Sequence, residues 1–170
     1  MAVCKEYNQL LQKAVSKKTH TRQFFNAVRR EDPMYITRLF QQLHEEVFRE
    51  IDCLKCANCC NTISPVITDR DVQKMARALK IKPSEVASTY LMIDDENDYV
   101  FKSTPCPFLD NIDNTCRIYE SRPKACREYP HTNHPDMRKV LNITYKNTFI
   151  CPAVYLIINE MEKYLNIKPY

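Results

Sequence analysis

Cysteines are the residues of this chain whose type and spacing most clearly point to chemistry. The chain holds nine of them, and eight form a set in which four lie close together and four follow singly. The set consists of Cys53, Cys56, Cys59, Cys60, Cys106, Cys116, Cys126 and Cys151. So many thiols serve either to cross-link a chain through disulfides or to hold soft metal ions as thiolates. Knowing which of these chemistries applies would indicate the compartment of the protein and most of what can be said of its function.

The composition favours reduced, metal-binding thiols. A chain of 170 residues can bury a sizeable core and does not need disulfides merely to fold. Its N-terminus shows no basic stretch followed by an apolar one, so no signal peptide is expected. Its longest apolar run, Ala153 to Ile158, is too short to span a bilayer. We expect a cytoplasmic protein whose clustered cysteines are ligands or redox thiols, with the distant Cys4 as an ordinary free cysteine.

The first four cysteines are spaced so that their sulfurs converge. On a helix, at about 100° per residue, Cys53, Cys56 and Cys60 share one stripe and Cys59 lies a little round from it. In a looser turn, the two Cys-x-x-Cys pairs would form knuckles that enclose an ion. The adjacent Cys59 and Cys60 would point apart in an extended segment. We therefore expect each of them to serve a different centre, or one of them to bridge two centres.

The number of thiols agrees with two kinds of metal centre. Eight thiolates match two tetrahedral four-sulfur sites. They equally match one or two iron–sulfur clusters, each held by four thiolates. Because zinc and iron both accept four sulfur ligands, the expected cofactor is zinc or iron, including an iron–sulfur cluster.

The net charge and the absence of glycine limit the classes of partner that this chain is expected to bind. The formal net charge is +4 with cysteine counted as neutral, and eight thiolates around two divalent ions would bring it to about zero. Metal ions are the expected partners; nucleic acid and membranes are not expected, and a protein partner remains open. There is no glycine, which excludes the Gly-rich phosphate loops. Turns must then be made by Asn, Asp and the ten prolines, and Asn accepts left-handed backbone angles.

Periodicity and capping residues predict a helix-rich chain. Residues 5–50 are expected to be helical, with one helix starting after Asp32-Pro33 and running directly into Cys53. Thr68 and Asp71 form a capping box ahead of a further helix. Other helices are expected to start at Lys82-Pro83, at Ser121-Arg-Pro-Lys and at Cys151-Pro152.

Short strands complete the predicted fold. Residues 91–93 and 99–101 are expected to form two strands around the acidic turn Asp94–Asp98. Residues 105–109 are expected to be extended, and Cys116–Tyr119 to be a strand. The prediction is an α+β fold: a small, helix-rich single domain with short β-hairpins, organised around a cysteine-ligated metal centre. We expect a helical N-terminal extension over 1–50 packed on the core, a metal-binding core over 51–155 and a C-terminal helix over 151–170.

The contexts of the cysteines resemble a known family. The matching elements are Cys53 to Cys60 as Cys-x-x-Cys-x-x-Cys-Cys, Cys106-Pro-Phe-Leu, Cys116-x-Ile-Tyr and Arg122-Pro-x-x-Cys126-Arg. Over roughly residues 50 to 155, the chain closely resembles the YkgJ-type cysteine-cluster proteins, a zinc- or iron-chelating domain. The resemblance implies metal chelation. Many members carry a glycine where this chain has Ala57-Asn58, and Asn58 is expected to supply the turn.

Two further inferences concern the surroundings of the cysteines. Arg122 and Arg127 could donate hydrogen bonds to thiolates and offset their charge, or be ordinary surface arginines. His131 and His134 are not needed as ligands when eight thiols are present. A related motif in flagellin lysine methylases leaves an alternative: an iron–sulfur-dependent redox or protein-modifying enzyme. No catalytic residue can be named, and enzyme activity is left open.

Overall fold

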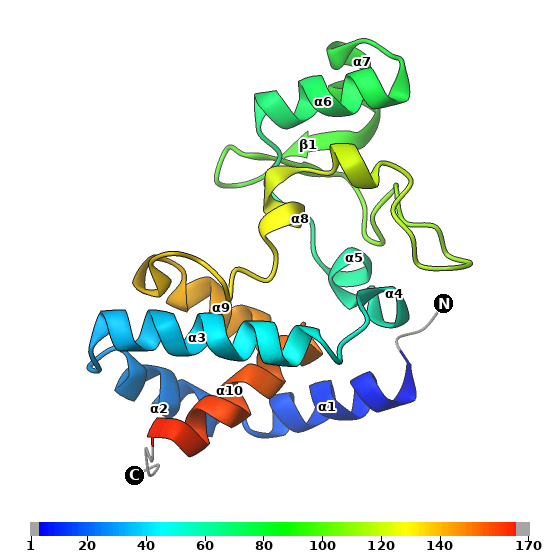
Figure 1. Ribbon diagram of the computed structural model, residues 1–170. Helices are drawn as coiled ribbons and strands as arrows, with labels where there is room; N and C mark the ends of the chain where they lie inside the picture. Colours follow the sequence, from blue (N-terminus) through cyan, green and yellow to red (C-terminus); the bar gives the residue numbers. More distant parts are fainter. Residues whose placement is uncertain (1–3, 166–170) are drawn as a thin grey trace. The chain divides into compact units, whose positions relative to one another are not determined.

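The computed structural model describes residues 4–165, which divide into two compact units (Figure 1). Residues 54–129 form one of them, which we call the cysteine unit. The described residues 4–53 and 130–165 form the other, which we call the helical unit. Helices dominate both units, and the described strands form a single two-stranded sheet. The expected helix-rich α+β class is thereby confirmed, with one hairpin among the described residues.

The helical unit is built on the packing of its longest helices. Its elements are α1 (Lys5–Ser16), α2 (Lys18–Val28), α3 (Pro33–Phe48), η2 (Met137–Lys139), α9 (Leu141–Asn147) and α10 (Pro152–Leu165). Helix α10 packs on α3 and on α1 (Figure 1). The buried core comprises Phe24, Phe25, Val28, Ile36, Leu39, Phe40, Leu43, Met137, Leu141, Val154, Ile157, Ile158 and Met161. Among the described residues, no helix combines the length and the apolar character needed to cross a bilayer.

Helix α3 begins where the sequence predicts and ends earlier. The Asp32 carboxylate accepts a hydrogen bond from the Tyr35 backbone N–H at 2.7 Å, and Pro33 fills the first helical position. The helix stops at Phe48, because the next N–H groups turn back to carbonyls only three residues earlier, as in Glu50 to Val47 at 3.1 Å. The expectation that this helix runs directly into Cys53 is therefore wrong.

The cysteine unit wraps short elements around its own apolar core. Its elements are α4 (Cys53–Cys56), which starts at the last residue before the unit, α5 (Asn58–Thr62), α6 (Asp69–Leu79), α7 (Pro83–Tyr90), β1 (Leu91–Ile93), β2 (Tyr99–Phe101), η1 (Tyr119–Ser121) and α8 (Lys124–Glu128). The buried core comprises Ile67, Val72, Met75, Ala76, Val86, Leu91, Phe101, Phe108 and Ile118. Helices α6 and α7 pack together, and α7 also packs on β1.

Local signals in this unit act as the sequence predicts. Thr68 and Asp71 make the capping box of α6, and Pro83 occupies the first turn of α7. Strands β1 and β2 pair antiparallel with Met92 opposite Val100. The acidic turn between them is closed by the Asp94 carboxylate, which accepts the backbone N–H of Asp98 at 2.9 Å. The expected hairpin is thereby confirmed.

Without glycine, other residues take the left-handed backbone positions. These positions are Ala57, Lys80, Asn97, Asn114 and His131. Two of the five are asparagines, as expected from the tolerance of this side chain for positive φ.

The segment around Cys116 differs from its predicted strand. Cys116 makes one isolated antiparallel bridge, with Leu109, and the chain then forms η1. Residues 106–109 are not fully extended either, since the Leu109 N–H turns back to the Cys106 carbonyl at 3.0 Å. The local β propensity of Cys116–Tyr119 is overridden because the facing chain offers only a turn as partner.

Candidate metal centre

The Cys-x-x-Cys-x-x-Cys-Cys motif folds as two short helices joined at a left-handed residue. Ala57 separates α4 from α5 with φ 46° and ψ 16°. Asn58 is the first residue of α5, so the expectation that Asn58 supplies the turn is wrong. The Ala57 carbonyl accepts the backbone N–H of Asn61 at 3.0 Å and its side-chain amide at 2.9 Å. The cysteines therefore do not follow a single helical stripe.

The break brings the two adjacent cysteines to a metal-compatible spacing. Cys59 and Cys60 lie in α5, and their Sγ atoms are 3.9 Å apart. The expectation that they point apart assumed an extended segment, whereas on a helix successive side chains diverge by only about 100°. Two tetrahedral ligands of zinc, each about 2.3 Å from the metal, would lie about 3.8 Å from one another. The pair can thus face a single ion.

Backbone contacts bring the next two cysteines to the same region. The Cys106 N–H donates to the Cys60 carbonyl at 2.8 Å. Cys116 lies opposite Leu109 in the isolated bridge, and the Arg117 N–H donates to the Phe108 carbonyl at 2.9 Å. The half-buried Cys106 and Cys116 side chains pack against the apolar core of the unit. An apolar wall on one side shields the sulfurs from water.

Cys126 reaches the cluster on α8, whose start is fixed by a buried carboxylate. Asp71 is only 2% exposed. Its Oδ1 accepts the Lys124 N–H at 3.0 Å, and its Oδ2 accepts the Thr68 hydroxyl at 2.6 Å. Because Lys124 is the first residue of α8, this carboxylate sets the position from which Cys126 projects. Sequence reasoning assigned Asp71 only to the capping box and missed its second bond.

Four of the thiols lie near enough to one another to influence one another's ionisation. Burial raises the pKa of Cys126 to about 12, and the nearby Cys60, Cys106 and Cys116 sulfurs raise it further. Burial also raises the pKa of Cys106 to about 11, with added contributions from Cys60 and Cys116. For Cys116, burial is again the largest cause that raises the pKa, and the Cys60 sulfur raises it further. Every pair among these four sulfurs is thus close enough to interact.

One thiol of this group differs from the others. A hydrogen bond with Cys59 lowers the pKa of Cys60 to about 7, against the raising effect of burial. Cys60 is therefore the member of the group most readily ionised at neutral pH. It also interacts with all three of the other thiols. Cys60 is the sulfur around which the group is arranged.

The two arginines singled out from the sequence lie near this group. The charge of Arg122 lowers the pKa of Cys116 and of Cys126, although burial of both thiols outweighs it. The Arg122 guanidinium stacks over the Tyr119 ring at 3.7 Å and donates to the Tyr119 carbonyl at 2.6 Å. Arg127 donates to the Arg122 carbonyl, and its charge acts on Asp71. Hydrogen bonds from either arginine to a thiolate stay a prediction.

The metal-free side chains are not closed into a finished site. Within residues 4–165, no group of three or more His, Cys, Asp or Glu side chains stands ready to hold an ion. The donor set is chemically suited to a soft ion: thiols from three separated segments, an apolar wall behind them and a guanidinium beside them.

The remaining predicted ligands are placed differently. Cys56 is buried in the cysteine unit, whereas Cys53 and Cys151 belong to the helical unit, where Cys151 packs against the core. Their role as ligands stays a prediction. His134 uses its Nδ1 to accept the Asp136 backbone N–H at 3.0 Å, as part of a local turn.

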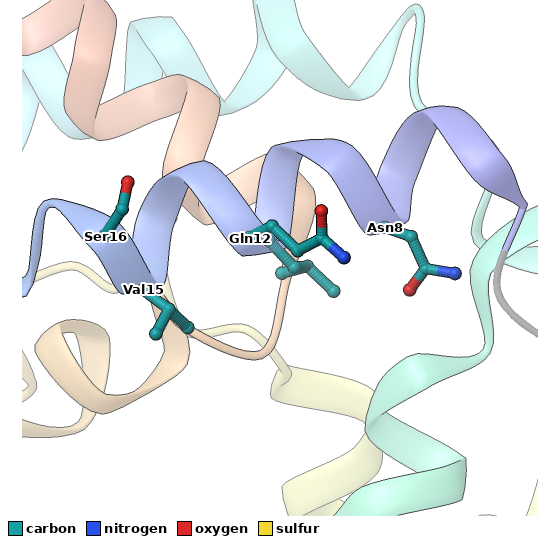
Figure 2. A pocket seen from close by; sticks show the side chains of 5 residues that line it. Asn8, Gln12, Val15 and Ser16 are labelled. Carbon is teal, nitrogen blue, oxygen red and sulfur yellow. The ribbon is translucent and has the colours of Figure 1, made fainter.

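A surface hollow lies along α1. It is lined by Asn8, Leu11, Gln12, Val15 and Ser16, and Figure 2 shows four of these side chains projecting from the same helix. These residues carry neither sulfur nor a titratable group. The hollow therefore offers no thiolate or imidazole ligand for zinc or iron and no acid–base chemistry.

The cysteine unit contains all of residues 106–126 and most of the cysteine motif. Residues 52–152 match the family model CxxCxxCC, described as "Putative zinc- or iron-chelating domain", and the chain belongs to this family. A relative, "Uncharacterized protein MJ0661" of Methanocaldococcus jannaschii, is 34% identical over 116 residues, which is 65% of this chain and 61% of the relative. The chain thus spans about three fifths of the length of this curated relative. No solved structure matches the chain.

Proposed function

We propose that the cysteine unit binds zinc or iron through an inner group of four thiolates, Cys60, Cys106, Cys116 and Cys126, which we call the quartet. The carrying observation is that these four cysteines, from three separated segments, lie near enough to one another for their ionisations to be coupled. The bond from the Cys106 N–H to the Cys60 carbonyl and the bridge at Cys116 support the same grouping. Family membership supports zinc or iron as the ion.

Cys59 belongs to the same proposal as a neighbouring ligand. Its sulfur lies 3.9 Å from that of Cys60, close to the edge of a tetrahedral zinc–thiolate site. The other three cysteines, Cys53, Cys56 and Cys151, complete the set of eight ligands that the sequence predicts. A reducing, cytoplasmic location is part of the proposal, because cysteine binds these metals as a thiolate and not as a disulfide.

A bound ion would contribute directly to the stability of this unit. Its thiols approach one another at the cost of burial and mutual repulsion, and a divalent cation offsets both. The Arg122 guanidinium reduces the remaining negative charge of the loaded quartet. A zinc ion held by four of these thiolates would serve a structural role.

Titration with zinc and with cobalt(II) tests the proposal. The metal-free chain and four variants, each with one quartet cysteine changed to serine, are titrated anaerobically with each metal. Wild type should develop the visible bands of tetrahedral cobalt–thiolate coordination, and each variant should lose intensity and affinity. Cys4→Ser is the matched control, since Cys4 lies outside the set, and it should titrate like wild type. Equal titrations of wild type and all four variants would contradict the quartet.

A further inference from the structure

The side chain of Asn114 is buried with its donor paired and its acceptor unpaired. Asn114 is 8% exposed and adopts a left-handed backbone with φ 61°. Its Nδ2 donates to the Leu54 carbonyl at 2.7 Å. Its Oδ1 is buried and accepts no hydrogen bond from the residues that the structure describes. Burying an unpaired acceptor costs free energy, so a purely structural role would favour a smaller or apolar side chain.

Within the cysteine unit, this hydrogen bond joins the segment of the first cysteines to the loop that precedes Cys116. Leu54 is the second residue of α4, between the first two cysteines, and Asn114 lies two positions before Cys116. Carbonyl groups in the last turn of a helix lack partners within that helix, and Asn114 supplies one for α4. The bond therefore ties the Cys-x-x-Cys turn to the loop that carries Cys116.

The loop that presents Asn114 is itself fixed. The Asn114 N–H donates to the Asp110 carbonyl at 2.9 Å, and the Asp110 N–H donates to the Thr115 carbonyl at 2.8 Å. The Asp113 carboxylate accepts the Thr115 N–H at 2.9 Å. The amide of Asn114 is thus held on a closed loop and directed at the motif.

We infer that Asn114 is a positioning residue for the metal centre: by fixing the Leu54 carbonyl it holds α4, which leads through Ala57 into the helix of Cys60, against the loop that carries Cys116. This inference rests on the proposed function. It predicts that the Nδ2 donor matters for metal affinity far more than for the fold of the metal-free chain. Loss of such an outer hydrogen bond around a metal site weakens metal binding by about 10- to 100-fold.

Two variants separate the side chain from the backbone. Asn114→Gly keeps the left-handed backbone and removes the amide. Asn114→Asp keeps the size and the tolerance for positive φ, but has no N–H to donate to Leu54. The matched control is Asn97→Gly, because Asn97 also has a left-handed backbone, at φ 65°, in the exposed turn between β1 and β2. Zinc affinity, the cobalt(II) spectrum and the melting temperature of the metal-free chain are measured for each.

The expected result is about 10- to 100-fold weaker zinc binding and an altered cobalt(II) spectrum in both Asn114 variants. Asn97→Gly should bind like wild type, and the metal-free melting temperature should change no more in Asn114→Gly than in Asn97→Gly. Wild-type affinity in either Asn114 variant would overturn the inference, as would an equal loss in the control. Unfolding of both metal-free Asn114 variants would assign the residue to the fold and overturn it too. A wild-type chain that binds no metal would instead remove the proposed function.

Discussion

The Asp71 carboxylate accepts the Lys124 backbone N–H at 3.0 Å, which joins the start of α6 to the start of α8. One buried side chain thereby completes a capping box and fixes the helix that carries Cys126. Removing it should loosen both elements together. The position of a thiol in the proposed quartet therefore depends on a residue far from it in the sequence.

Asp71→Asn tests this dependence. Asparagine retains one acceptor oxygen but loses the charge and the second acceptor, so the free energy of unfolding should fall by about 2 kcal/mol. Zinc affinity should fall as well, because Cys126 projects from α8. Urea denaturation of the metal-free chain measures the first effect and competition with a chelator the second. Asp69→Asn, in the same first turn but exposed, is the control. An unchanged zinc affinity in a destabilised Asp71→Asn chain would contradict the link to Cys126.

The stabilisation that the Asp71 carboxylate provides should weaken at low pH. Burial raises the pKa of Asp71, but hydrogen bonds from Thr68 and Lys124, together with the charge of Arg127, outweigh it and lower the pKa overall. The folded pKa is then below the unfolded value of about 3.9, so the stabilisation is present above about pH 4 and is lost as the pH falls through the folded pKa. The stability difference between wild type and Asp71→Asn should shrink on acidification. A constant difference down to about pH 2 would contradict the lowered pKa.

Ala57 provides a second prediction, because its left-handed backbone divides the motif. Glycine takes φ 46° without strain, so Ala57→Gly should remain within about 1 kcal/mol of wild type and keep its metal affinity. Valine is β-branched and resists positive φ, so Ala57→Val should lose about 2 kcal/mol and bind metal more weakly. Thermal unfolding and zinc competition measure both. Equal behaviour of the two variants would show that Ala57 does not govern the motif.

Lys80 tests the same physical rule away from the cysteines. It ends α6 at φ 56°, where the Ile81 N–H reaches back to the Ala76 carbonyl at 3.1 Å, and its side chain is exposed. Lys80→Gly should raise the free energy of unfolding by about 0.5 to 1 kcal/mol. Gln73→Gly, at an exposed position in the interior of the same helix, should lower it by about 1 kcal/mol. Urea denaturation measures both effects. A change of the unfolding free energy in the same direction for both variants would contradict the prediction.

Metal affinity should depend steeply on pH. Burial and the neighbouring sulfurs raise the pKa values of Cys106 and Cys126 to about 11 and about 12, so both thiols are protonated at neutral pH in the metal-free chain. An ion must displace these protons to bind, so affinity rises with pH below these pKa values. Zinc binding should tighten at least about tenfold per pH unit between about pH 6 and 8. Calorimetry in buffers of different ionisation enthalpy counts the released protons, and a count of zero would contradict thiolate ligation.

Local signals made much of the fold predictable. Asp32 and Thr68 each specify a helix start by accepting a backbone N–H of the first turn, and Pro33 and Pro152 occupy first positions at which no N–H needs a partner. The hairpin followed from apolar triplets on both sides of an acidic turn. In each case, the residues that carry the signal are also the residues that make the contact.

The departures from prediction arise from contacts that local sequence does not encode. The left-handed Ala57 has no signal, because alanine favours helices and the chain offers no glycine to mark the break. The end of α3 at Phe48 and the loss of the strand at Cys116 depend on which partner each segment meets. The gathering of the quartet was implied by the cysteine count, but the roles of Asp71 and Asn114 depend on partners 53 and 60 residues away.

The metal content of the anaerobically purified chain tests the central claim most directly. Wild type and Cys126→Ser are compared by elemental analysis, acid-labile sulfide and visible spectrum, with Cys4→Ser as control. Zinc without colour would identify a thiolate-held ion, and iron with sulfide and brown colour an iron–sulfur cluster. The account predicts at least one zinc or iron per chain in wild type and in Cys4→Ser, and a marked loss in Cys126→Ser. A folded wild-type chain without metal, or equal metal content in all three proteins, would contradict it.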